Sequence, residues 1–186
     1  MDADLRDRSS SRVQLILSAK SLGPAAAASK FTETPGTRQT LEAALEKAAR
    51  EVFEMMVGTS LDSADHATLP TVADYTALVG LAGDLSGVLS FRCATASAHR
   101  IASQMLGTEE APSEECVRDA IGEVCNMIAG SFKGQISDLA DQCMLSVPMV
   151  VSGKDYQLYP LVDGARVQVP LTFYDAQLWI TLDLHS

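Results

Sequence analysis

An acid and an amide, Glu123 and Asn126, are the residues of this chain whose types and spacing could do chemistry together. They are three positions apart in a stretch with a helical pattern, so their side chains point the same way. An ionised carboxylate can pair with a cation, and a neutral amide can both donate and accept hydrogen bonds. The same pair is also common on the solvated surface of a helix. Whether this pair has a chemical role or is only solvated surface therefore depends on the rest of the chain.

The element that must position this pair is a long amphipathic helix, predicted over residues 113–139. At about 100° per residue, apolar side chains gather on one face, namely Val117, Ile121, Val124, Cys125, Ile128, Phe132, Ile136 and Leu139. The opposite face carries a polar stripe, namely Asp119, Glu123, Asn126, Gly130, Lys133 and Ser137. Ser113, followed by two glutamates, is a typical helix start. Gly130 leaves a dip in the middle of the stripe.

Composition limits the classes of function. The chain has 186 residues, 47% of them apolar, and a net charge of −10. This length and composition predict one folded domain with a full core, and the charge argues against nucleic acid and anionic membrane as partners. The four cysteines form no CxxC pair and are expected to be buried, reduced thiols. No apolar run approaches the ~18 residues of a membrane span, and the acidic start does not resemble a signal peptide. We expect a cytoplasmic protein without a metal of its own.

The other elements are predicted from periodicity and turn residues. Residues 1–36 read as an N-terminal extension or linker, and residues 37–186 as the folded domain. A helix is expected over 37–58 with Gly58 as its C-cap, and a short helix over 97–106. Two strands around a glycine-containing turn are expected within 75–94, one strand containing Pro148 over 144–153, and a hairpin over 166–184.

An internal repeat relates the two long helices. The segment REVFEMMVG (50–58) matches GEVCNMIAG (122–130), with Glu, Val, Met and Gly recurring in step. Each helix is later followed by a strand–turn–strand, which indicates a duplicated unit; a chance likeness between two amphipathic helices is the alternative. Where the second copy has Asn126, the first has Glu54. If the site handles a phosphoryl group, a carboxylate there would repel it, so the first copy is expected to be inactive.

The run DAIGEVCNMIAGSFKGQ, the upstream LVGLAGDLSGVLSF and the later LSVPMVVSG resemble the CheC/CheX/FliY family of chemotaxis phosphatases. The resemblance covers roughly residues 37–186. The family's helical Glu-x-x-Asn motif, in a D-A-x-G-E-x-x-N-M-x-x-G context, matches residues 119–130. CheC-like members carry the motif in both repeats. This chain has it once, which is the CheX pattern.

The resemblance implies hydrolysis of the phosphoaspartate on a CheY-type response-regulator receiver domain. Glu123 would contact the lysine of the receiver's active site, and Asn126 would orient the attacking water. Asp119, Gly130 and Lys133 would belong to the partner-binding surface, with magnesium held by the receiver rather than by this chain. The implied fold is α+β, a mostly antiparallel sheet with two long, pseudo-symmetric helices on one face. A homodimer formed through sheet strands is also implied.

Two other functions stay open at this stage. A non-catalytic module that binds phosphorylated receivers would use the same surface as a phosphatase, so the sequence does not separate them. A component of the flagellar switch is a further alternative, since FliM and FliY share the implied fold. The chain lacks FliM's short receiver-binding peptide, which makes this the weaker alternative.

Overall fold

The computed structural model describes residues 14–17, 35–64, 73–136, 143–154, 156–160 and 164–185. Its helical elements are α1 (Pro35–Val52), the π-helix η2 (Phe53–Val57), α2 (Thr95–Leu106) and α3 (Glu114–Gln135). Its strands are β1 (Gln14–Leu17), β2 (Asp62–Ser63), β3 (Tyr75–Gly83), β4 (Gly87–Cys93), β5 (Cys143–Leu145), β6 (Met149–Ser152), β7 (Gln157–Pro160), β8 (Arg166–Phe173) and β9 (Ala176–Leu184).

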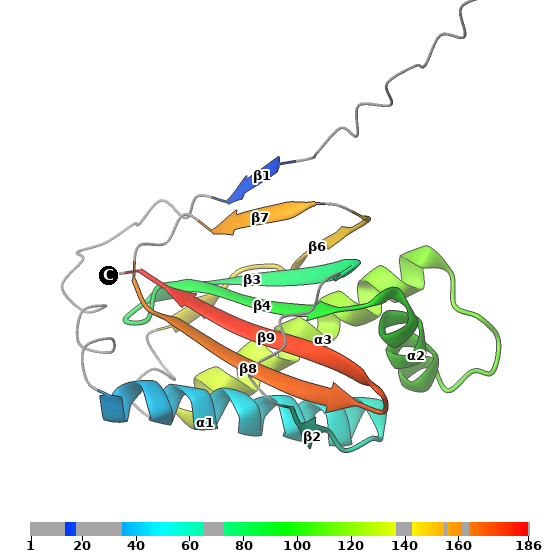
Figure 1. Ribbon diagram of the computed structural model, residues 1–186, viewed down its shortest axis with the longest axis horizontal. Helices are drawn as coiled ribbons and strands as arrows, with labels where there is room; N and C mark the ends of the chain where they lie inside the picture. Colours follow the sequence, from blue (N-terminus) through cyan, green and yellow to red (C-terminus); the bar gives the residue numbers. More distant parts are fainter. Residues whose placement is uncertain are drawn as a thin grey trace, which may run out of the picture.

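Seven strands form one antiparallel sheet with the order β2-β8-β9-β4-β3-β5, in which β6 also pairs with β3. The helices α1 and α3 lie side by side along one face of this sheet, and α2 lies at one end (Figure 1). On the other side, β1 and β7 form a separate parallel pair. The expected α+β architecture, with two long helices on one face, is confirmed.

The core lies between the helices and the sheet because each element presents an apolar face there. All the predicted apolar positions of α3 from Val117 to Phe132 are fully buried. On β9 the predicted face, Leu178, Ile180, Leu182 and Leu184, is buried as well. The opposite face of β9 is also covered, since Thr181 and Asp183 are only 6% and 5% exposed. The sheet is therefore covered on both faces around β9.

The long helices begin and end close to the predicted positions. The first runs from Pro35 through η2 to Val57, and Gly58 closes it in the left-handed conformation with φ of 71°, which glycine adopts without strain. The second begins at Ser113, whose side chain accepts a hydrogen bond from the backbone N–H of Cys116. It ends at Gln135, before the predicted end, and residues 137–139 lie outside the described part.

The single strand predicted over 144–153 is wrong, because it is broken into β5 and β6. Both pieces pair with β3. Pro148, which cannot donate a backbone hydrogen bond, lies in the gap between them. The backbone N–H of Ser146 donates to the carbonyl oxygen of Gly80 (2.9 Å), and its hydroxyl accepts from the N–H of Gly80 (2.8 Å). The side chain thus supplies part of the pairing that the broken strand loses.

The repeat is visible in the topology. In each copy a long helix is followed by an antiparallel hairpin, β3–β4 after the first helix and β8–β9 after the second. The two hairpins meet where β4 pairs with β9 along six residues of each strand. The two long helices pack against each other on the same face. A duplicated helix-plus-hairpin unit explains this arrangement, as the sequence predicted.

Candidate functional site

The two residues that could do chemistry lie on the surface of α3, a helix anchored along its other face. Glu123 is exposed and Asn126 is partly exposed. Within the described part of the chain, neither side chain forms a hydrogen bond or an ion pair. An acid and an amide one helical turn apart are therefore both available to a partner.

The other members of the predicted stripe are on the same side of α3, as the helical spacing requires. Asp119 and Gly130 are exposed, and Lys133 is partly exposed. A Cβ atom added at Gly130 would meet no atom within 4 Å, so there is open space above this glycine. The structure thus places all five predicted site residues on one accessible stripe. Ser137 lies outside the described residues.

Packing on both sides fixes the direction of the stripe. On one side, a Cβ atom added at Gly122 would lie 3.2 Å from Val150 Cγ2 and 3.8 Å from Pro148 Cβ. On the other side, Glu51 of α1 accepts hydrogen bonds from Ser131 Oγ (3.1 Å) and Gln135 Nε2 (3.0 Å) of α3. The stripe lies between these two contacts and is covered by neither.

Glu51 and Glu123 correspond in the repeat but have different surroundings. Glu51 is engaged with α3, and Lys47 Nζ is 3.7 Å from its Oε1. Glu123 has no such partners among the described residues. Glu54, which stands where the second copy has Asn126, is exposed on the π-helical turn η2. The first copy therefore offers neither a free acid at its Glu position nor an amide beside it.

The start of α3 is held by a polar cluster. Tyr75 Oη donates to Glu114 Oε2 at 2.5 Å, and His99 Nε2 is 3.3 Å from Glu114 Oε1. The hydrogen bond from Tyr75 lowers the pKa of Glu114. Burial, together with this hydrogen bond, raises the pKa of Tyr75 to about 12. The cluster ties the first turn of α3 to β3 and α2, which fixes the helix that carries the stripe.

No cysteine is placed to act as a nucleophile in the stripe. Cys125 follows Val124 on the core side, is fully buried, and burial raises the pKa of its thiol to about 12. A protonated thiol inside the core is unreactive. All four cysteines are free thiols, as predicted. Cys116 is the exception to the expected burial, since it is partly exposed near the start of α3.

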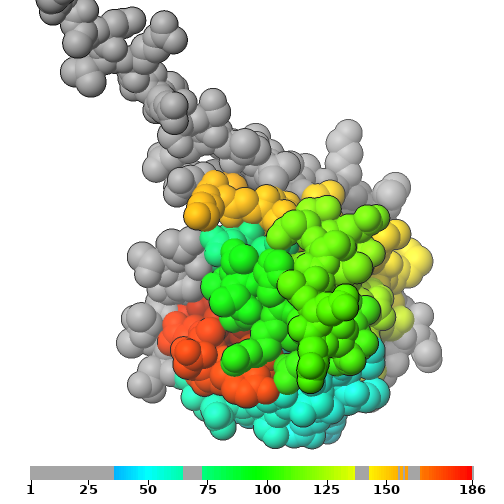
Figure 2. Space-filling view, turned by 90° about the vertical axis from the view of Figure 1, so that its right-hand side faces the viewer, coloured from blue at the N-terminus to red at the C-terminus, as the bar shows by residue number. Residues whose placement is uncertain are grey.

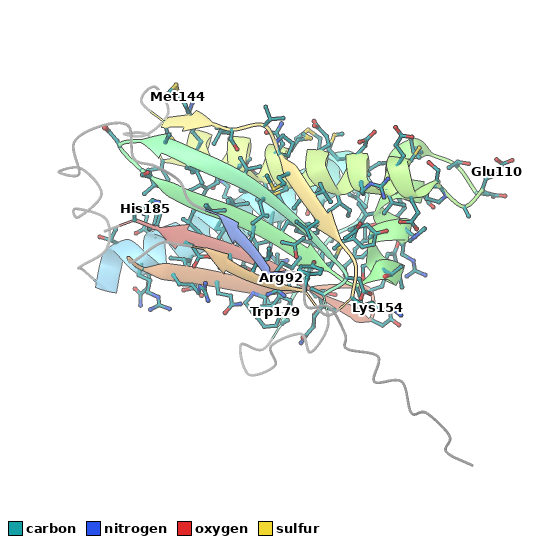
Figure 3. The ribbon with its side chains drawn as sticks, turned by 90° about the horizontal axis from the view of Figure 1, so that it is seen from above. Arg92, Glu110, Met144, Lys154, Trp179 and His185 are labelled. Carbon is teal, nitrogen blue, oxygen red and sulfur yellow. The ribbon has the colours of Figure 1, made fainter. Side chains whose placement is uncertain are left out.

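The sequence reasoning missed two features beside the stripe. Gly122 is one helical turn before Asn126 and is the glycine of α3 that packs closely, against Val150 of β6 and Pro148 in the segment between β5 and β6. That segment and the two strands that flank it carry exposed apolar side chains: Met144 is 72%, Val147 86% and Met149 49% exposed. In Figure 3, β5, where Met144 is labelled, runs beside α3. The run Met-x-x-Val-Pro-Met was visible in the sequence, but its edge position was not.

The described residues contain no group of three or more His, Cys, Asp or Glu side chains that could hold a metal ion. Among the helices in the described ranges, none is long and apolar enough to cross a membrane.

Comparison with known proteins gives the family. The model of the family described as chemotaxis phosphatase CheX matches residues 75–172, more than half of the chain. The CheY-P phosphatase CheX of Thermotoga maritima is 28% identical over 109 residues, covering 58% of this chain and 67% of that protein.

Solved structures share the fold. The chemotaxis protein CheX from Vibrio vulnificus superposes with a TM-score of 0.69 at 22% identity, over 80% of this chain and 98% of that one. A chain of the CheX–CheY–BeF3–Mg2+ complex from Borrelia burgdorferi does so with a TM-score of 0.62 at 18% identity, over 77% of this chain and 97% of that one. With the family model, these likenesses lead to one conclusion: the chain belongs to the chemotaxis phosphatase CheX family.

Proposed function

We propose that this chain is a phosphatase that hydrolyses the phosphoaspartate of a CheY-type receiver domain. The observation that carries the proposal is the free pair Glu123 and Asn126 on α3, in a chain of the CheX family. The name of the Thermotoga relative, CheY-P phosphatase, supports the reaction and the substrate. The Borrelia complex of CheX with CheY supports the class of partner.

The chemistry suits an acid and an amide. Phosphoryl transfer passes through a loose transition state, so positioning and charge placement matter more than a strong base. Asn126 is the residue we assign to the attacking water, because a neutral amide can hold a water in line without repelling phosphoryl oxygens. Glu123 is assigned to the lysine of the receiver's active site, which it would contact by a charge-assisted hydrogen bond. The partial burial of Asn126 reduces the rotational freedom that the amide must lose on docking.

The rest of the stripe would contact the receiver. Asp119 and Lys133 flank the pair and offer one charge of each sign. Gly130 leaves space in which the partner can approach the helix backbone. We assign magnesium to the receiver, where it would sit beside the phosphoaspartate. The cytoplasm is the proposed location, since receiver domains of this kind act there.

Measurement of phosphate release from a phosphorylated receiver tests the assignment. Asn126→Ala should lower the stimulated rate by about 10²-fold or more, as expected for the loss of one preorganised polar group. Glu123→Ala should mainly raise KM. Glu54→Ala is the matched control, because Glu54 is exposed at the corresponding position of the first copy, and its rate should equal that of the wild type. Binding without phosphate release by the wild-type protein would instead identify a non-catalytic receiver-binding module, and a wild-type rate in Asn126→Ala would refute the role of the amide.

We also propose a homodimer formed through sheet strands. The supporting observation is the edge made by β5 and β6, which pair only with β3 in the described part of the sheet and carry the exposed Met144, Val147 and Met149. An unpaired edge with apolar side chains favours pairing with another chain. Sedimentation equilibrium should give twice the monomer mass, and Val147→Asp should dissociate the dimer. A monomer over a wide range of concentration would contradict this proposal.

A further inference from the structure

A pocket at the start of α2 lies apart from the stripe on α3. It has a volume of about 220 Å³ and is lined by Ala96, Ser97, Arg100, Phe173, Asp175 and Ala176. The first three belong to α2, and the others to the turn between β8 and β9 and its ends. Figure 2 looks onto this end of the molecule, where the green residues of α2 lie against the red residues that begin β9. None of the lining residues belongs to the proposed phosphatase site.

One residue that lines the pocket carries a buried polar group without a partner. Ser97 is 3% exposed, and its Oγ is buried with no hydrogen bond. An unpaired buried hydroxyl costs free energy, so native structures usually satisfy such groups. To reach a bound molecule, this hydroxyl would rotate about the Cα–Cβ bond from one staggered position to another. The hydroxyl is therefore a reserve hydrogen-bond partner for a bound molecule.

The backbone of α2 adds two donors. The N–H groups at the start of a helix have no partner within the helix. Here Asp74 Oδ2 accepts from the N–H of Thr95 (3.0 Å) and from its hydroxyl (2.7 Å), and the N–H of Ala98 donates to the carbonyl of Ala94. In the described part of the chain, no acceptor is found for the N–H groups of Ala96 and Ser97. Both residues line the pocket, and a carboxylate bound at the start of α2 would find two unpaired donors in these N–H groups.

The rim of the pocket carries one charge of each sign. The Arg100 guanidinium stacks on the ring of Tyr174, with Cζ 4.3 Å from the ring centroid, which preorganises it. Gln104 Nε2 donates to Tyr174 Oη at 2.9 Å. Tyr174 adopts φ of 56°, a conformation that a tyrosine rarely takes. This turn places the carboxylate of Asp175 at the pocket, opposite in charge to Arg100.

These observations decide between ligands. A multiply charged anion such as phosphate would be repelled by Asp175, by Asp74 at the helix start, and by the net charge of −10. A simple cation would be repelled by Arg100. A zwitterion would satisfy both charges, and the volume suits a small metabolite, being below the ~300 Å³ that is usual for drug-sized ligands. We propose that this pocket binds a small α-amino acid, its carboxylate on Arg100 and the N–H groups of Ala96 and Ser97, and its ammonium on Asp175.

Titration of the 15N-labelled full chain with L-alanine tests the proposal. Three comparison probes are used: acetate carries only the carboxylate, ethylamine carries only the ammonium group, and phosphate is a multiply charged anion. Alanine should shift the amide signals of Ala96 and Ser97 with saturation in the millimolar range. Each of the other probes should bind at least about tenfold more weakly, since each loses a charge-assisted contact. If acetate or phosphate bound as tightly as alanine, the assignment of a zwitterionic ligand would be refuted. If alanine gave no saturable shifts, the proposal that this pocket binds an amino acid would be refuted.

Variants separate this site from a general surface effect. Arg100→Gln and Asp175→Asn should each weaken alanine binding by about tenfold or more. Ser97→Ala should weaken it several-fold while leaving the free protein at least as stable, because it removes an unsatisfied hydroxyl. The controls Arg38→Gln and Glu110→Gln change exposed residues away from the pocket and should have no effect. An equal loss in the controls, or no loss in Arg100→Gln and Asp175→Asn, would contradict the assignment.

Discussion

Gly130→Ala should make the protein more stable and a poorer phosphatase at once. Gly130 is in the interior of α3, and a Cβ atom there would meet nothing within 4 Å. Alanine therefore gains helix propensity without a clash, worth about 0.8–1 kcal/mol in a helix interior. For a domain of this size, this gain corresponds to a rise in Tm of roughly 2–4 °C. The added methyl group would fill the dip into which the receiver is proposed to fit.

The effect on activity follows from the same methyl group. Overpacking of a fitted interface costs roughly 1–3 kcal/mol, so KM for the phosphorylated receiver should rise by about fivefold or more. The rate at saturation should change less, because Asn126 keeps its position. Differential scanning calorimetry gives Tm, and phosphate release over a range of receiver concentrations gives KM and kcat.

Gly36 supplies a control on the other long helix. A Cβ atom there would also meet nothing within 4 Å, and Gly36 is in the first turn of α1 rather than on the stripe of α3. Gly36→Ala should raise Tm, by less than Gly130→Ala because the ends of a helix fray, and should leave KM unchanged. A fall in Tm for Gly130→Ala would contradict the claim that a Cβ atom at this position meets no other atom. An unchanged KM would refute the idea that the receiver approaches α3 at Gly130.

Two further predictions concern the scaffold. Gly87→Ala should destabilise the fold by roughly 3 kcal/mol or more, because its Cβ atom would lie 2.2 Å from the backbone oxygen of Asp183 on the paired strand. Chemical denaturation measures the loss of unfolding free energy, and a loss below about 1 kcal/mol would contradict the predicted clash. Tyr75→Phe should lower Tm near neutral pH by removing the hydrogen bond to Glu114. The pKa of Glu114 is lowered in the folded state, so this stabilisation exists above its unfolded-state pKa and is lost as pH falls through the folded value. The pKa of Tyr75 is raised to about 12, so its contribution is complete below about pH 10 and is lost toward pH 12. The Tm difference between wild type and Tyr75→Phe should therefore be largest near neutral pH and shrink below about pH 4; a difference that stays constant at acid pH would contradict the coupling.

Much of the fold could be predicted because local signals and tertiary packing agree. Gly58 and Gly107 close their helices in left-handed conformations, and Ser113 caps α3, as residue type alone indicates. The division of one strand into β5 and β6 could not be predicted. Pro148 indicated an edge or a bulge, but the break also involves Ser146, which forms hydrogen bonds with Gly80 on the neighbouring strand. That contact joins residues 66 positions apart, and no local pattern records it.

The two candidate sites also differ in how far the sequence could predict them. A helical period was sufficient to place Glu123, Asn126 and Gly130 on one stripe, because all three belong to α3. The pocket at the start of α2 could not be found by such reasoning, since Ser97 and Asp175 come from different elements and each has an ordinary sequence context. Only the fold shows that the hydroxyl is buried without a partner and that a charge of each sign faces the same space.

The two copies of the repeat show why a motif match is not by itself a site. Glu51 and Glu123 are equivalent by sequence, and each lies on a long helix of the same face. In the first copy, Ser131 and Gln135 of α3 donate to the carboxylate, so the acid holds the two helices together and is not free to bind a partner. In the second copy the described residues leave the carboxylate without a partner, with an amide rather than Glu54's charge at the neighbouring position. The two helices therefore carry one acid that stabilises the helix pair and one that is available to a partner. This asymmetry makes a chain with a single motif consistent with catalysis on one helix only.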